Sequence, residues 1–235
     1  MLNLRLTPGY CLALYCLTAI THTLHEFVHH AAGYAVCGAW GYMTFNRFEL
    51  ACAVEPTIYL STYAGPAFTF ALMWLGLALL GGASRFAKHL GLALIFAQTS
   101  WQRMLMPFFG KNDEYFASAQ LFGANDVTYW AVVAIVWAIC LPPLIGAYRV
   151  IANKRRSLWF VLFFLFIPFV PYALAYWLLE QALVRGVLDE TVIGVPMLAI
   201  VNFAATAAVL ALSIRFIDPE TQGRVTPRTP AASKA

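Results

Sequence analysis

Charged residues are scarce in this chain. Asp, Glu, Lys and Arg make up 11% of its 235 residues, whereas roughly 25% is usual in a soluble domain. Hydrophobic residues make up 61%, and the mean hydropathy is +0.71. This composition excludes an ordinary soluble protein and predicts an integral protein of the lipid bilayer. The net charge of +4 does not indicate nucleic-acid binding, because the basic residues are concentrated on one side of the expected membrane topology. No nucleic-acid partner is expected.

The sequence also lacks a Cys-x-x-C pair, so nothing in it supports a zinc site built from cysteines. Cys11, Cys16 and Cys140 lie in apolar segments, where they are expected to pack as small apolar side chains. Cys37 and Cys52 flank a connection that is expected outside the cytoplasm, where a disulfide can form. The spacing alone leaves both a disulfide and two free thiols open at these positions.

Hydropathy predicts an all-α polytopic membrane protein with about six transmembrane helices. One transmembrane domain covers residues 1–217, and the polar residues 218–235 are expected to form a disordered cytoplasmic tail. Between Gly41 and Leu50, aromatic and β-favouring residues predict either a short β-hairpin after the first span or an interfacial loop. We place the spans at Pro8–Val36, Ile58–Leu80, His89–Met106, Tyr129–Val150, Leu158–Leu179 and Val192–Phe216.

Lys and Arg are distributed unequally between the two sides of this topology. The positive-inside rule places the richer side, which carries both termini, in the cytoplasm. We therefore expect an integral membrane protein, in a membrane such as the bacterial inner membrane, with both termini cytoplasmic. The poorer side holds Arg47, Arg103, Lys111 and Arg185, and the richer side holds Arg5, Arg85, Lys88, Arg149, Lys154, Arg155, Arg156, Arg215, Arg224, Arg228 and Lys234.

The first span contains the box His25-Glu26-Phe27-Val28-His29. Residues four apart share one face of a helix, so His25 and His29 can hold a single zinc ion between them. Glu26 lies where the general base of a zinc hydrolase belongs. Ionisable groups are costly inside a membrane, which makes a functional role the default interpretation. His22 shares the same face but would strain a tetrahedral site as a third ligand from one helix, so we expect it beside the site.

Three motifs together resemble those of the site-2 protease family of intramembrane zinc metalloproteases. They are the His25–His29 box, Ala64-Gly65-Pro66 in the second span, and the segment Met104-Leu-Met-Pro-Phe-Phe-Gly-Lys-Asn-Asp113. The resemblance covers residues 20–120 and implies a protease-like core over residues 8–122, with the helices of residues 129–216 added to it. The chain departs from the family pattern at three places: Thr69 and either Arg103 or Met104 replace Asn, and Glu114 replaces Gly.

The resemblance implies a set of roles for these residues. His25, His29 and Asp113 would hold Zn²⁺, and Glu26 would act as the catalytic base. Gly65, Pro66, His22, Gln98 and Gln102 are expected around the site or along a path by which water reaches it.

Three acids compete for the third ligand position, and Asp113 is the one that we expect there. Asp113 can begin a short helix that runs to Phe122, which would fix its direction, and the resemblance favours it. Asp126 precedes the fourth span, where a helix cap is a sufficient explanation. Glu114 would face about 100° away from Asp113 on a helix.

These expectations lead to a zinc metalloendopeptidase that hydrolyses peptide bonds of membrane-associated protein or peptide substrates. The alternative is a non-catalytic membrane subunit that keeps a protease-like fold. Its histidines would then bind a pigment, haem or structural metal. Partner subunits are compatible with both interpretations.

Overall fold

The protein is helical, as expected, and its computed structural model describes residues 1–52, 58–110 and 112–218. Residues 219–235, which make up most of the expected disordered tail, lie outside the described residues. Within the described part, five helices are long and apolar enough to cross a membrane, by length and composition. They are Pro8–Cys37, Tyr59–Leu80, Asp126–Val150, Arg156–Val184 and Met197–Ile217.

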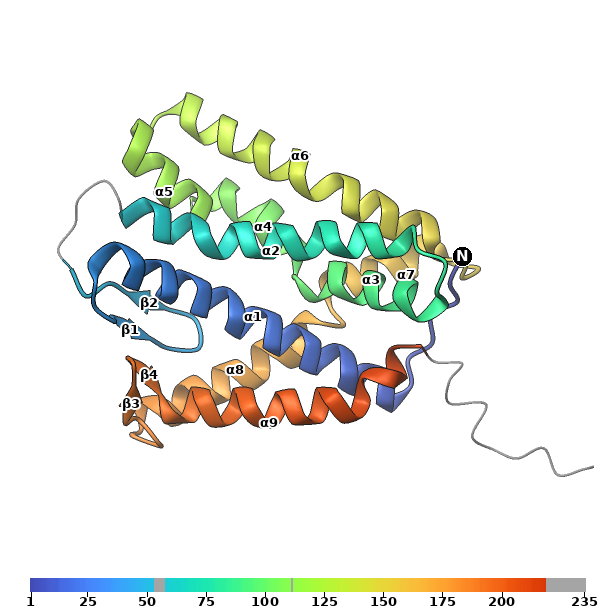
Figure 1. Ribbon diagram of the computed structural model, residues 1–235. Helices are drawn as coiled ribbons and strands as arrows, with labels where there is room; N and C mark the ends of the chain where they lie inside the picture. Colours follow the sequence, from blue (N-terminus) through green and yellow to red (C-terminus); the bar gives the residue numbers. More distant parts are fainter. Residues whose placement is uncertain (53–57, 111, 219–235) are drawn as a thin grey trace, which may run out of the picture.

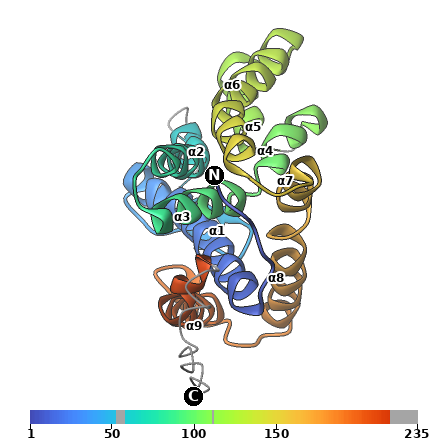
Figure 2. The same ribbon diagram turned by 90° about the vertical axis from the view of Figure 1, so that its right-hand side faces the viewer.

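Helix α1 (Pro8–Cys37) is central and carries the histidine box (Figure 2). It begins sharply because the Thr7 hydroxyl accepts a hydrogen bond from Tyr10 N and because Pro8 suits the first helical turn. It ends at Gly38, whose φ of 68° is a left-handed conformation that glycine adopts without steric cost. Helix α1 packs against α2 (Ile58–Leu80) on one side and against α9 (Met197–Ser213) on the other (Figure 1).

The third expected span, His89–Met106, is wrong as a single helix. The chain forms α3 (Arg85–Ala97) and then α4 (Ser100–Leu105), with Thr99 between them at φ 47° and ψ 46°. Side chains at the break take over backbone hydrogen bonds: Ser100 Oγ donates to Ile95 O and Gln98 Nε2 donates to Leu94 O. Such local bonds offer the backbone an alternative to a continuous helix, and they leave a polar bend inside the bundle.

The chain nevertheless traverses the bundle between α2 and the next long helix (Figure 1). A 3₁₀ turn, η1 (Met106–Phe109), and α5 (Asp113–Phe122) lead from the bend to α6 (Asp126–Val150). The helices α7 (Arg156–Leu165) and α8 (Phe169–Val184) follow, and α9 continues into η2 (Ile214–Ile217). The sixth expected span therefore starts later than Val192, because residues 191–196 form a hairpin instead of a helix.

Two short hairpins meet at the end of the bundle opposite the N-terminus (Figure 1). The expected hairpin is confirmed: β1 (Tyr42–Met43) pairs antiparallel with β2 (Phe48–Glu49). The second, β3 (Thr191–Val192) with β4 (Val195–Pro196), has no counterpart among the sequence expectations. A bond of 2.9 Å from Met43 N to Gly194 O joins the two hairpins. A disulfide between Cys37 and Cys52 ties the first hairpin to the end of α1.

Candidate metal centre

Three acceptor atoms from two distant segments of the chain, α1 and the start of α5, meet at one point. His25 Nε2 and His29 Nε2 lie 3.1 Å apart, and Asp113 Oδ2 lies 3.5 Å and 3.6 Å from them. Both histidines are buried, at 2% and 1% exposure, and the aspartate is partly buried. The structure thus brings together the three residues expected from the sequence, in a group that could bind a metal ion.

Hydrogen bonds on the far side of each imidazole fix which nitrogen faces this point. His29 Nδ1 lies 2.7 Å from Ser61 O, which can only accept, so Nδ1 carries the proton of the neutral ring. His25 Nδ1 lies 2.9 Å from Thr69 Oγ1. Arg103 donates to His25 Nε2, which therefore also presents a lone pair. Outer partners of this kind orient metal-binding histidines. The lone pairs on Nε2 of His25 and of His29 face each other, and they repel unless a cation lies between them.

Asp113 reaches the histidines because it occupies the first position of α5. The side chain of Asn112 caps that helix by accepting from Tyr115 N, which fixes where the helix starts. The short helix Asp113–Phe122 expected from the sequence is confirmed. Burial raises the pKa of Asp113, but contacts with His25 and His29 and the charge of Arg103 outweigh it and hold the pKa well below its ordinary value. The carboxylate is therefore ionised.

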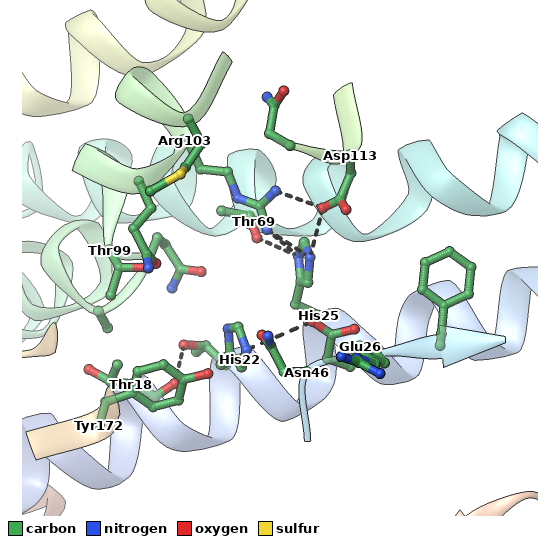
Figure 3. A pocket seen from close by; sticks show the side chains of 18 of the residues that line it. Thr18, His22, His25, Glu26, Asn46, Thr69, Thr99, Arg103, Asp113 and Tyr172 are labelled. Carbon is green, nitrogen blue, oxygen red and sulfur yellow. Dashed lines mark hydrogen bonds and ion pairs between the residues drawn. The ribbon is translucent and has the colours of Figure 1, made fainter. Parts of the chain in front are cut away.

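Among the described residues, Arg103, on α4, is the cation that contacts these acceptors. Its Nη2 lies 2.7 Å from His25 Nε2, and its Nη1 lies 2.8 Å from Asp113 Oδ2 (Figure 3). Nη1 also lies 3.5 Å from Glu114 Oε2. The guanidinium thus bridges two of the three atoms that would bind a metal. Its place near the end of the third expected span was visible in the sequence, but its contact with the histidine box was not.

Helix α2 approaches the histidines closely at Gly65. A methyl group added there would overlap His29 Nε2 and would lie 2.7 Å from His25 Cε1. Neither approach is possible between non-bonded atoms, so glycine is required at this point of contact. Pro66 follows within the helix, and Thr69, one turn further on, reaches His25. The small-Gly-Pro motif therefore lies directly against the histidine box.

A cavity of about 480 Å³ opens beside the three acceptors, and Glu26 lines it together with His25 and Asp113 (Figure 3). Glu26 is buried, with Oε1 3.8 Å from His22 Nε2. The residues expected beside the site or along a path for water also line this cavity: His22, Gln98 and Gln102. Its lining includes further polar residues to which the sequence analysis gave no role at the site: Asn46, Arg47, Thr18, Thr21 and Tyr172.

The first hairpin covers the other side of the site. The ring of Phe48, on β2, stacks on His29 with centroids 4.4 Å apart and planes 5° from parallel. His30, which directly follows the histidine box, is buried at 2% exposure. Its Nε2 lies 2.8 Å from Ile193 O, and its ring stacks on Trp40. His30 therefore holds the second hairpin and does not join the metal group.

The two competing acids lie elsewhere. Glu114 is buried, contacts Asn112 Nδ2 at 2.7 Å and turns its carboxylate towards Arg103. Asp126 is exposed in the first turn of α6, where Asn125 provides the cap by accepting from Thr128 N. The expectation that Asp126 itself caps the helix is therefore wrong by one residue.

Comparisons of the chain with protein-family models, with curated proteins and with solved structures found no match. The likeness to the site-2 protease family therefore depends on the histidine box, on Gly65 and Pro66, and on Asp113.

Proposed function

We propose that this protein is a zinc metalloprotease embedded in the membrane. The triangle of acceptor atoms formed by His25, His29 and Asp113 carries the proposal. A tetrahedral ion with ligand bonds of roughly 2.0–2.1 Å separates its ligand atoms by roughly 3.3–3.4 Å. The three separations of 3.1, 3.5 and 3.6 Å bracket that value. Two imidazoles and one carboxylate form a donor set that zinc hydrolases use, with the fourth position open.

The cavity residues supply the remaining chemistry. Zinc bound at the triangle would polarise a peptide carbonyl and acidify a water molecule. Glu26 lines the same cavity, so its carboxylate can take a proton from that water and return it to the departing amine. His22 Nε2 lies 3.8 Å from Glu26 Oε1. Gln98 and Gln102 offer hydrogen bonds to water or to an unwound substrate backbone.

Substrates of such a site are membrane proteins or peptides that present an extended segment to it. A backbone in helical form has already paired its carbonyl groups, so it must unwind before hydrolysis. The polar bend at Thr99 and the cavity beside it provide an environment in which an unwound segment can remain hydrogen-bonded.

One observation favours a second candidate, a non-catalytic membrane subunit. Arg103 donates to both His25 and Asp113. A guanidinium in this place can neutralise the aspartate and satisfy the histidine without any metal. In that case the box is a buried ion-pair network or holds another group, such as a structural metal, haem or a pigment.

Metal analysis combined with proteolysis separates the two candidates. The purified full chain is expected to hold about one zinc and to cleave a model transmembrane peptide. Glu26→Gln is expected to keep the zinc and lose cleavage, whereas His25→Ala and His29→Ala lose both. His30→Ala, which changes the histidine next to the box, serves as the control that keeps the metal. Stoichiometric haem or pigment without zinc, or bound zinc without cleavage by the unaltered chain, would favour the second candidate.

We further propose that both termini face the cytoplasm, because the basic residues concentrate on the side that carries them. The opposite side carries Cys37 and Cys52, which suits an oxidising compartment. Reporter fusions after Ala235 test this orientation. A fluorescent protein is expected to be active there, and an active phosphatase at the same point would contradict it.

A further inference from the structure

A second cavity, of about 350 Å³, adjoins the first one. The residues Asn46, Gln102 and Tyr172 line both cavities, and Figure 3 shows Tyr172 beside His22 on the side away from Asp113. From there the second cavity extends along α8 towards its C-terminal end. A peptide bound at the proposed metal centre would therefore present a neighbouring side chain to this cavity.

Aromatic residues make up half of its described lining. Tyr172 and Tyr176 lie on one face of α8 with ring centroids 4.3 Å apart, and Phe45 meets Tyr176 edge to face at 5.4 Å. Phe169 and Trp177 complete the aromatic lining, and Trp177 remains 59% exposed. The Tyr176 hydroxyl is fixed by donation to Ala19 O at 3.0 Å, so the ring is held in place. Faces of aromatic rings attract cations through the ring quadrupole.

Glu180 supplies a negative charge at the end of this wall. It is the one charged residue among the described residues that line the cavity. Its Oε2 is buried, and in the described part of the chain no hydrogen-bond partner reaches it. Glu180 also lies near the C-terminus of α8, where the helix dipole disfavours an acid. A buried carboxylate oxygen without a partner, placed against the dipole, costs stability unless a cation approaches it.

We propose that this cavity is a specificity subsite for a basic side chain, lysine or arginine, of the peptide substrate. The aliphatic stem of such a side chain would pass between Asn46 and Gln102, its charged end would lie over the aromatic rings, and Glu180 would pair with it. The subsite rests on the proposed protease function for its biological use. Its ability to bind a cationic side chain does not require hydrolysis.

A binding measurement on Glu26→Gln protein tests the subsite independently of cleavage. The probes are two fluorescein-labelled extended Ser/Ala peptides that differ at one central position, lysine in one and the uncharged norleucine in the other. Fluorescence anisotropy with the detergent-solubilised full chain is expected to give a Kd about tenfold lower for the lysine peptide. Equal affinities, or no binding of the lysine peptide, would overturn the proposal.

Matched variants identify the groups responsible. Glu180→Gln and Trp177→Ala, each added to Glu26→Gln, are expected to abolish or strongly reduce the preference for lysine. Glu190→Gln and Trp74→Ala change an exposed acid and an exposed tryptophan away from the cavity, and they are expected to retain it. A preference that survives Glu180→Gln would overturn the subsite. A lysine preference in binding without cleavage by the unaltered chain would keep the subsite and reject the protease.

Discussion

Arg103 donates a hydrogen bond of 2.7 Å to Nε2 of His25, the nitrogen that a metal ion at the triangle would need. The same guanidinium holds Asp113 at 2.8 Å. A divalent cation and Arg103 therefore compete for the same two acceptors, and they would repel each other at close range. The arginine would have to turn away, towards Glu114 or into the cavity, if the triangle bound a metal.

Replacing Arg103 is therefore expected to strengthen zinc binding. We expect Arg103→Gln to lower the Kd for zinc by about tenfold, which corresponds to about 1.4 kcal/mol, in competition with a fluorescent chelator. Arg47→Gln is the control, because Arg47 lines the same cavity but contacts none of the three acceptors among the described interactions. A loss of zinc affinity in Arg103→Gln would mean that the guanidinium organises the ligands instead of competing for them.

Two aspartates that each follow an asparagine allow a matched test of the third ligand. Asp113→Asn is expected to raise the Kd for zinc at least about tenfold, because an amide oxygen carries no charge for the ion. Asp126→Asn, in the exposed first turn of α6, is expected to leave the Kd unchanged. Chelator competition measures both. Similar losses in the two variants would point to a general effect on folding, and a loss in Asp126→Asn alone would reverse the assignment.

The close contact at Gly65 predicts a steric effect. Gly65→Ala places a methyl group on top of His29 Nε2, so the helices must separate or the ring must rotate. We expect this variant to lose stoichiometric zinc and its free energy of unfolding to fall by about 1–3 kcal/mol because of overpacking. Metal analysis measures the first effect, and thermal unfolding in detergent measures the second. In Gly81→Ala the nearest atom lies at an ordinary 3.4 Å, and that variant should behave as the unaltered protein. Normal zinc content in Gly65→Ala would show that the approach of α2 to His29 does not control the metal site.

Substitutions of the neighbouring residues His29 and His30 are expected to have different effects, one on metal binding and the other on the attachment of the second hairpin. His30→Ala removes the bond to Ile193 O and the stacking on Trp40, so we expect a loss of about 1–2 kcal/mol in stability with the zinc content unchanged. His29→Ala should instead lose the zinc. Amide hydrogen exchange of residues 191–196 should accelerate in His30→Ala. Zinc loss in that variant would show that His30 takes part in the metal site.

The disulfide predicts a linked pair of cysteines in the isolated protein. Mass spectrometry without reductant is expected to recover Cys37 and Cys52 in one cross-linked peptide. Cys52→Ser is expected to lower the free energy of unfolding by up to about 3 kcal/mol, since the disulfide closes a loop of 15 residues. Cys11→Ser, at an exposed free cysteine, serves as the control. Two free thiols at Cys37 and Cys52 would reject the pairing.

Several elements of this fold are specified by local signals that can be read from the sequence. Thr7, Pro8 and Gly38 mark the ends of α1, and the spacing of His25 and His29 places both on one of its faces. Five of the six expected spans correspond to the five candidate spans of the described residues, and the third does not. The aromatic and β-favouring residues of the first connection indicated the first hairpin. Each of these features depends on capping, periodicity or hydrophobicity within one segment, so a single sequence contains the necessary information.

Other features depend on how the folded helices pack, and no local sequence signal specifies them. The break at Thr99 replaced a continuous third span with two short helices, because polar side chains there bond to nearby backbone. The structure places the carboxylate of Asp113 beside the histidines and turns that of Glu114 towards Arg103. Neither the approach of Arg103 to His25 nor the stacking of Phe48 on His29 has a local signal. Such contacts arise from how the helices pack, which composition and periodicity do not specify.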